Sequence, residues 1–91
     1  MMAKKIAVLA RDRQEEALRM SIGLTLLDDV IDVYVLDRAL VDNDKNALNV
    51  ETMNDMEMKA FTNFKGNEGM EFLSTAEIAE RLKDYDHIIF Y

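Results

Sequence analysis

Two arginines and an aspartate, Arg11, Asp12 and Arg13, follow the first apolar segment of the chain. Paired guanidinium groups beside the start of a helix suit a phosphate or carboxylate, because they combine bidentate hydrogen bonds with the positive end of the helix dipole. The turn lacks the glycine that lets a pyrophosphate approach the backbone closely. Two interpretations stay open, an anion site and a solvated turn in which Asp12 caps the helix, and the missing glycine favours the second.

The single histidine is the other candidate for chemistry. His87 is flanked by Asp84 and Asp86, and an imidazole titrates near neutral pH, where it can act as an acid or a base. However, it begins the last predicted strand, at the opposite end of the sheet from Arg11, so we expect a structural role. No serine, threonine or lysine has an evident activating partner, and no catalytic residue is predicted.

Cysteine and metal chemistry are not expected. The chain has no cysteine, which excludes disulfides, thiolate ligands and cysteine nucleophiles. Asp42, Asp44 and Asn46 repeat the first, third and fifth positions of a calcium-binding EF-hand loop. Ala47 and Met53 stand where that loop needs glycine and glutamate, so the match is accidental. We expect no metal and no other cofactor.

Length and charge limit the possible partners. The 91 residues predict one domain over residues 1–91, and the formal net charge of -7 opposes binding to nucleic acid or anionic lipid. No apolar stretch approaches the ~20 residues of a membrane span, and the short apolar run after Lys4 and Lys5 is too short for a signal peptide. We therefore expect a cytoplasmic protein that binds neither nucleic acid nor membrane.

The hydrophobic pattern predicts the element order β-α-β-α-β-α-β. Continuous apolar runs indicate buried parallel strands, helical spacing indicates amphipathic helices, and Ser74 and Glu77 form a capping box before the last helix. The predicted strands cover residues 6–10, 30–36, 58–64 and 87–91, and the predicted helices cover residues 14–27, 47–55 and about 75–83.

The polarity of the strands predicts their spatial order. The first two are almost wholly apolar and the third alternates, which favours a four-stranded, mainly parallel sheet in the order 3-2-1-4, within a three-layer α/β/α domain. The alternative order, 2-1-3-4, would place the alternating strand inside. In the preferred order, the crevice between strands one and four is the topological switch point, where open α/β sheets bind ligands. Arg11, Asp12, Arg13 and Tyr91 border that crevice.

Several segments resemble small proteins of the DsrE-like family. The resemblance lies in residues 6–37, including the helix sequence EALRMSIGL, in residues 72–79, FLSTAEIA, and in residues 85–89, YDHII. It implies an α/β/α domain that often assembles into dimers, trimers or hexamers. In the best-known members it also implies the transfer of persulfide sulfur between proteins.

The resemblance also implies where a site would lie. Active members carry a cysteine in the loop after a mid-chain strand, and the equivalent region here, residues 63–69, has none. A persulfide needs a thiolate, so this chain cannot carry sulfur by that mechanism. Through this loop the resemblance adds Asn63 and Lys65 to the candidate ligand-binding residues.

The first helix has more apolar surface than one sheet-facing side needs. Leu18, Ile22 and Leu26 widen its stripe, and we expect them to contact a second protomer. The sequence thus favours a non-enzymatic, DsrE-like accessory or interaction domain that self-associates or binds another protein, tied to sulfur metabolism but unable to carry persulfide. The alternative is a binding protein or enzyme for small anionic metabolites, using the crevice at the carboxyl ends of the strands.

Overall fold

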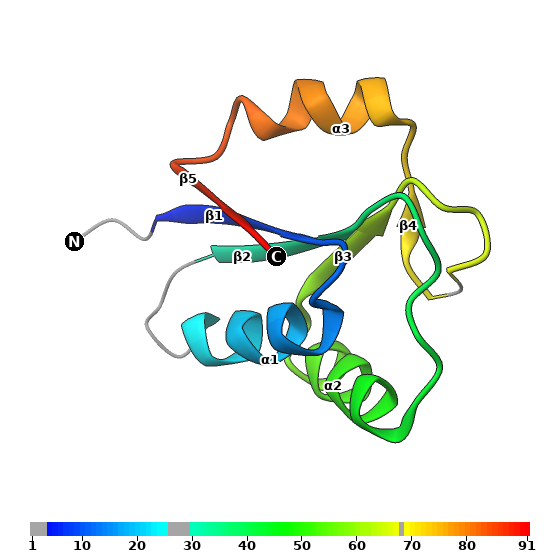
Figure 1. The fold of residues 1–91 in the computed structure, drawn as a ribbon. Helices are drawn as coiled ribbons and strands as arrows, with labels where there is room; N and C mark the ends of the chain where they lie inside the picture. Colours follow the sequence, from blue (N-terminus) through cyan, green and yellow to red (C-terminus); the bar gives the residue numbers. More distant parts are fainter. Residues whose placement is uncertain (1–3, 26–29, 68) are drawn as a thin grey trace.

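The computed structural model describes residues 4–25, 30–67 and 69–91. These residues form one parallel sheet with α1 and α2 on one face and α3 on the other (Figure 1). The elements are, in chain order, β1 (Lys5–Ala10), α1 (Gln14–Thr25), β2 (Val30–Val35), α2 (Asp44–Asp55), β3 (Lys59–Thr62), β4 (Glu71–Phe72), α3 (Thr75–Leu82) and β5 (His87–Phe90).

The strand order in the described residues is β4-β3-β2-β1-β5, and every neighbouring pair is parallel. This confirms the predicted α/β class and three layers, and the predicted order 3-2-1-4 is present as β3-β2-β1-β5. The predicted count of four strands was one short. The two-residue strand β4 pairs with β3, Phe61 opposite Glu71 and Thr62 opposite Phe72, so β3 is not the edge strand that its alternation predicted.

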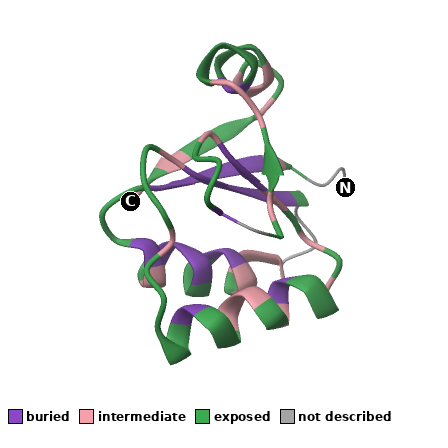
Figure 2. Cartoon of the chain, turned by 90° about the vertical axis from the view of Figure 1, so that its right-hand side faces the viewer, coloured by how far each residue is buried: buried purple, intermediate pink, exposed green. Residues whose placement is uncertain are grey.

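Each face of the sheet carries its own core. Ile6, Val8 and Ala10 of β1 pack toward α1 and α2, whereas Ala7 and Leu9 face α3. β1 and most of β2 are therefore buried on both faces, as Figure 2 shows, which explains why both strands are almost wholly apolar, with Asp32 the one charged residue of β2. α3 covers less, and Ile78 is its one fully buried residue.

The predicted capping box at the start of α3 is confirmed. The Ser74 hydroxyl accepts a hydrogen bond from the Glu77 N–H at 3.1 Å, and the Glu77 carboxylate accepts one from the Ser74 N–H at 3.0 Å. The bond from the Ser74 N–H, and then the Ser74 hydroxyl, lower the pKa of the Glu77 carboxyl. None of the described helices has the length and apolar character needed to cross a membrane.

The cap of α1 and the start of α2 differ from the prediction. α1 begins at Gln14 as predicted, but the Arg13 carbonyl accepts from the Ala17 N–H at 3.0 Å, so Arg13 occupies the N-cap position and the predicted cap by Asp12 is wrong. α2 begins three residues earlier than predicted. The Asn43 side chain caps it by accepting from the Asn46 N–H at 2.8 Å, a local interaction that helical periodicity does not report.

Candidate functional site

The turn between β1 and α1 lies at the carboxyl edge of the sheet, where the sequence predicted an anion site. All three of its charged side chains are engaged in ion pairs, two of them with the loop that follows β2. The pairs join Arg11 to Asp37 at 2.6 Å, Asp12 to Arg38 at 2.9 Å, and Arg13 to Glu16. An anion would have to compete with carboxylates for both guanidinium groups.

The backbone of the same turn is also occupied. The N–H groups of Arg11 and Asp12 both donate to the main-chain oxygen of Tyr91, at 2.9 and 3.3 Å. In phosphate-binding turns such groups point at the ligand. The Arg13 guanidinium lies 5.3 Å from the centre of the Tyr91 ring. Tyr91 thus joins the turn as predicted, but through contacts that hold β5 to α1.

Asn63 stabilises the residue that pairs with Arg11. Asp37 has a φ of 67°, in the left-handed region, and its N–H donates to the Asn63 amide oxygen at 2.6 Å. The Asn63 amide nitrogen donates to the Asp37 carboxylate and to the Thr75 hydroxyl, each at 3.0 Å. The hydrogen bond from the Asn63 amide nitrogen, and then the charge of Arg11, hold the pKa of the Asp37 carboxyl below its ordinary value.

Lys65 and the predicted interface residues do not belong to the cluster of paired charges at the β1–α1 turn. Lys65 lies beyond Asn63 with its ammonium 5.7 Å from the centre of the Phe72 ring. Leu18 has no exposed surface, because it belongs to the core between α1 and the sheet. Ile22 is half-buried against the same core, and Leu26 lies outside the described residues.

Two buried amides hold the loop between β2 and α2. Gln14, the first residue of α1, donates to the Ala39 carbonyl at 3.0 Å and accepts from the Val41 N–H at 2.9 Å. Asn67 accepts from the Leu40 N–H at 2.7 Å and donates to the Arg38 carbonyl at 3.2 Å. Both side chains therefore supply hydrogen bonds to backbone groups of residues 38–41, which lie in a loop and have no neighbouring strand to pair with.

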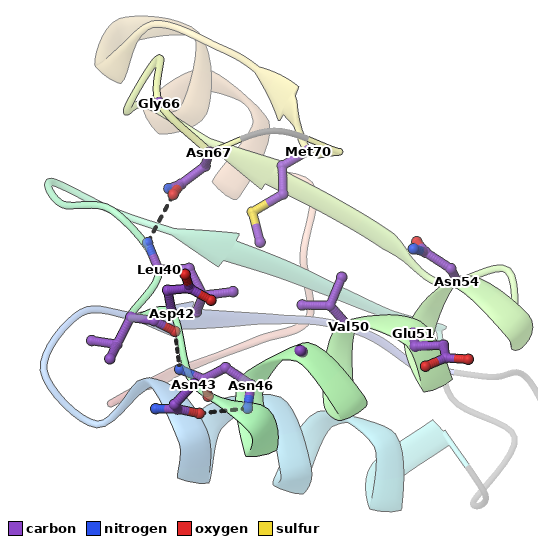
Figure 3. Close-up of a pocket in the computed structure, with 12 residues that line it drawn as sticks. Leu40, Asp42, Asn43, Asn46, Val50, Glu51, Asn54, Gly66, Asn67 and Met70 are labelled. Carbon is purple, nitrogen blue, oxygen red and sulfur yellow. Dashed lines mark hydrogen bonds between the residues drawn. The ribbon is translucent and has the colours of Figure 1, made fainter.

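A third buried amide, Asn46 in the first turn of α2, binds the same loop. Its amide nitrogen donates to the Val41 carbonyl at 2.9 Å. Beside it lies a hollow of about 590 Å³ between α2, this loop and the segment around Asn67 (Figure 3). Sequence reasoning missed Gln14 and Asn67 and considered Asn46 only as a metal ligand. Neutral amides in polar segments carry no pattern that sets them apart.

A chain of polar groups crosses the opposite face of the sheet, under α3. Arg81 Nε lies 3.2 Å from the Tyr34 hydroxyl, the Tyr34 and Tyr85 hydroxyls are 2.7 Å apart, and Tyr85 donates to the Asp32 carboxylate at 2.5 Å. Because Tyr85 gives its proton to Asp32, Tyr34 donates to Tyr85 and Arg81 donates to Tyr34. Burial, and then the bond to Asp32, raise the pKa of the Tyr85 hydroxyl.

The outer strand β5 forms an open apolar edge. β1 occupies one side of β5, and no described strand pairs with the other. Ile88 and Phe90 lie opposite Ala7 and Leu9 and so face the α3 side, with relative exposures of 37% and 76%. His87 begins this strand as predicted and is exposed.

Comparisons of the chain with protein-family models, with curated proteins and with solved structures found no match. Within the described residues, no group of three or more His, Cys, Asp or Glu side chains is placed to hold a metal ion.

Proposed function

We propose that this chain is a cytoplasmic, non-enzymatic interaction domain that self-associates through β5. The observation that carries the proposal is the open edge of this strand, whose sequence His87 to Phe90 has no Lys, Asp, Glu or Pro. Unpaired backbone groups on such a strand are a template for another strand, and proteins that must avoid pairing protect them with charges, proline or bulges. The opposite edge, β4, has only two residues.

A second copy of β5 is the partner that best fits this edge. Antiparallel pairing of two identical strands around a two-fold axis presents the same patch on both copies. It would bring the acidic residues before β5, Asp84 and Asp86, toward the end of the partner strand that lies next to Arg11 and Arg13. Because both guanidinium groups are already paired with carboxylates of their own chain, these charges add little, and the pairing depends on the backbone and apolar side chains of β5.

The side chains support the same pairing. Ile88 and Phe90 lie on one face of the sheet, and in an antiparallel pair centred on Ile89 the Ile88 side chain of each copy would lie opposite Phe90 of the other. Burying the Phe90 ring would remove the most exposed large apolar side chain in the described residues from water.

A binding role without catalysis agrees with the polar regions described above. The charged groups of the β1–α1 turn are already paired with other side chains of the chain, and the buried tyrosines and amides hold the fold together. The DsrE-like resemblance adds a more specific proposal, an accessory subunit tied to sulfur metabolism. The lack of any disulfide is compatible with the reducing cytoplasm.

Sedimentation equilibrium tests the proposal. We expect self-association of the wild-type chain at ~100 μM or below, and a loss of affinity of at least about tenfold in Phe90→Lys, because the lysine must be desolvated at the edge. Phe72→Lys is the matched control, since Phe72 is an exposed phenylalanine on the opposite edge strand. A monomeric wild-type chain at that concentration, or equal effects of the two substitutions, contradicts the proposal.

A further inference from the structure

The strand β5 carries its largest apolar side chain on the outside. Ile88 and Phe90 face the α3 side, where Phe90 is 76% exposed. Ile89 and Tyr91 pack on the other side, against the core that β1 shares with α1 and α2. These four residues are consecutive and all apolar or aromatic. A strand with two apolar faces specifies its register weakly, because hydrophobicity does not decide which pair faces the core.

A shift of β5 by one residue would bury Phe90. Side chains alternate between the faces of a strand, so a shift in either direction moves Phe90 to a core-facing position. The residues that then face α3 are His87 and Ile89 for one direction, and Ile89 and Tyr91 for the other. Each of these pairs contains a more polar side chain than Ile88 and Phe90 do. Burial of apolar surface therefore favours a shifted register, and another interaction must hold the observed one.

The backbone bonds at the carboxyl end of β5 do not select the register. The Tyr91 N–H donates to the Leu9 carbonyl at 2.9 Å. The N–H groups of Arg11 and Asp12 donate to the main-chain oxygen of Tyr91 at 2.9 and 3.3 Å. Phe90 carries the same backbone groups as Tyr91 and could take its place in these bonds. Only contacts made by side chains can distinguish one register from another.

Two side chains fix the amino end of the strand. The Asp86 carboxylate accepts from the Lys5 N–H at 2.8 Å, while the Asp86 N–H donates to the Lys5 carbonyl at 2.7 Å. Tyr85, one residue earlier, donates to the buried Asp32 carboxylate at 2.5 Å. A shift by one residue moves the chain by about 3.3 Å, which is more than either side-chain bond can stretch. The observed register is therefore the one that keeps both bonds.

We propose that Asp86 is a positioning residue that, together with Tyr85, sets the register of β5 and so holds Phe90 on the outer face. A polar anchor just before the strand thus creates the apolar surface of the strand. The consequence for self-association rests on the proposed function, whereas the register is a property of the single chain.

NMR at a concentration below that of self-association measures the register. In the wild type, backbone nuclear Overhauser contacts should join Val8 to Ile89. In Asp86→Ala, a change at an exposed position, we expect a second set of contacts that joins Val8 to Ile88 or Phe90. Self-association should be correspondingly weaker, and adding Tyr85→Phe should enlarge the shifted population and reduce the affinity at least about tenfold. The wild-type contacts alone in Asp86→Ala overturn the proposal, and so does a strand that leaves β1 without taking a new register.

Two matched variants separate the choice of register from a general loss of contacts. Asp86→Asn keeps a side-chain oxygen that accepts from the Lys5 N–H, and it should keep the wild-type register and affinity. Asp84→Ala removes an exposed carboxylate that makes no hydrogen bond or ion pair with the described residues, and it should change neither. A shifted register in either variant contradicts the proposal. If the wild type is monomeric, the proposed function fails, but the register measurements still decide the role of Asp86.

Discussion

The β1–α1 turn and the β2–α2 loop lie side by side at the carboxyl edge of the sheet, but they use polar residues in opposite ways. The turn pairs exposed charges, and the side chains of Arg11 and Asp37 are 58% and 44% exposed. The loop is held by the buried neutral amides of Gln14, Asn46 and Asn67. Exposed ion pairs contribute about 0–1 kcal/mol, whereas a buried group that loses its partner costs about 1–3 kcal/mol. The buried amides of the loop should therefore stabilise the fold more than the exposed ion pairs of the turn.

The largest expected effect comes from Asn67→Ala. The substitution removes hydrogen bonds to the Leu40 N–H, the Arg38 carbonyl and the Thr62 hydroxyl, and the first two of these groups lose the partner that the structure describes for them. We expect the free energy of unfolding to fall by about 3 kcal/mol in urea denaturation. Asn54→Ala, an exposed amide on α2, should change it by less than about 0.5 kcal/mol. Similar losses in both variants would remove the distinction between buried amides and surface groups.

Breaking the chain of tyrosine hydroxyls under α3 should lower the free energy of unfolding as much as breaking a buried amide contact of the loop, and more than breaking an ion pair of the turn. Tyr85→Phe leaves the buried Asp32 carboxylate without its donor, and we expect a loss of about 2 kcal/mol in the free energy of unfolding. Tyr91→Phe, at a tyrosine whose described contacts involve its ring and backbone, should be nearly neutral. If Tyr85→Phe is neutral as well, the chain of hydroxyls does not anchor α3.

The raised pKa of Tyr85 gives a pH dependence of known sign. The unfolded chain loses this proton near pH ~10, whereas the folded chain retains it, so the unfolded state binds fewer protons above that pH. The stabilisation is fully present below pH ~10 and is lost as the pH rises further. Denaturation at several pH values above neutrality should show this decline in the wild type and a smaller one in Tyr85→Phe. A steeper decline in the variant would contradict the assignment.

The smallest effect is expected at the charged turn. Arg11→Gln should lower the free energy of unfolding by less than about 0.5 kcal/mol, and the loss should shrink further in high salt. NMR titration offers a sharper measurement. Because the hydrogen bond from Asn63 and both the charge and the hydrogen bond of Arg11 lower the pKa of Asp37, Asn63→Ala and Arg11→Gln should each raise that pKa. An unchanged pKa in either variant would contradict these contacts.

The sequence predicted the parts of the fold that arise from strong, local patterns. The apolar runs of β1 and β2 predicted their central place, and Ser74 and Glu77 predicted the start of α3. The strand β4 was missed because two residues are too few for a periodic signal. Arg11 and Asp12 were recognised as site candidates, but their partners Asp37 and Arg38 come from a separate loop, so their neutralisation is a tertiary effect. The buried amides were missed for the same reason.

The polar groups of the turn and most of those in the loop are already paired within the chain, whereas the outer edge of β5 has no described strand partner. We therefore propose above all that β5 pairs with a second copy of itself. Backbone hydrogen exchange at β5, measured as the protein concentration is raised, tests it directly. In the monomer, the β5 amides that face away from β1 lack a strand partner and should exchange readily. We predict that their protection rises with concentration in the wild type and not in Phe90→Lys. Protection that is independent of concentration would contradict the claim.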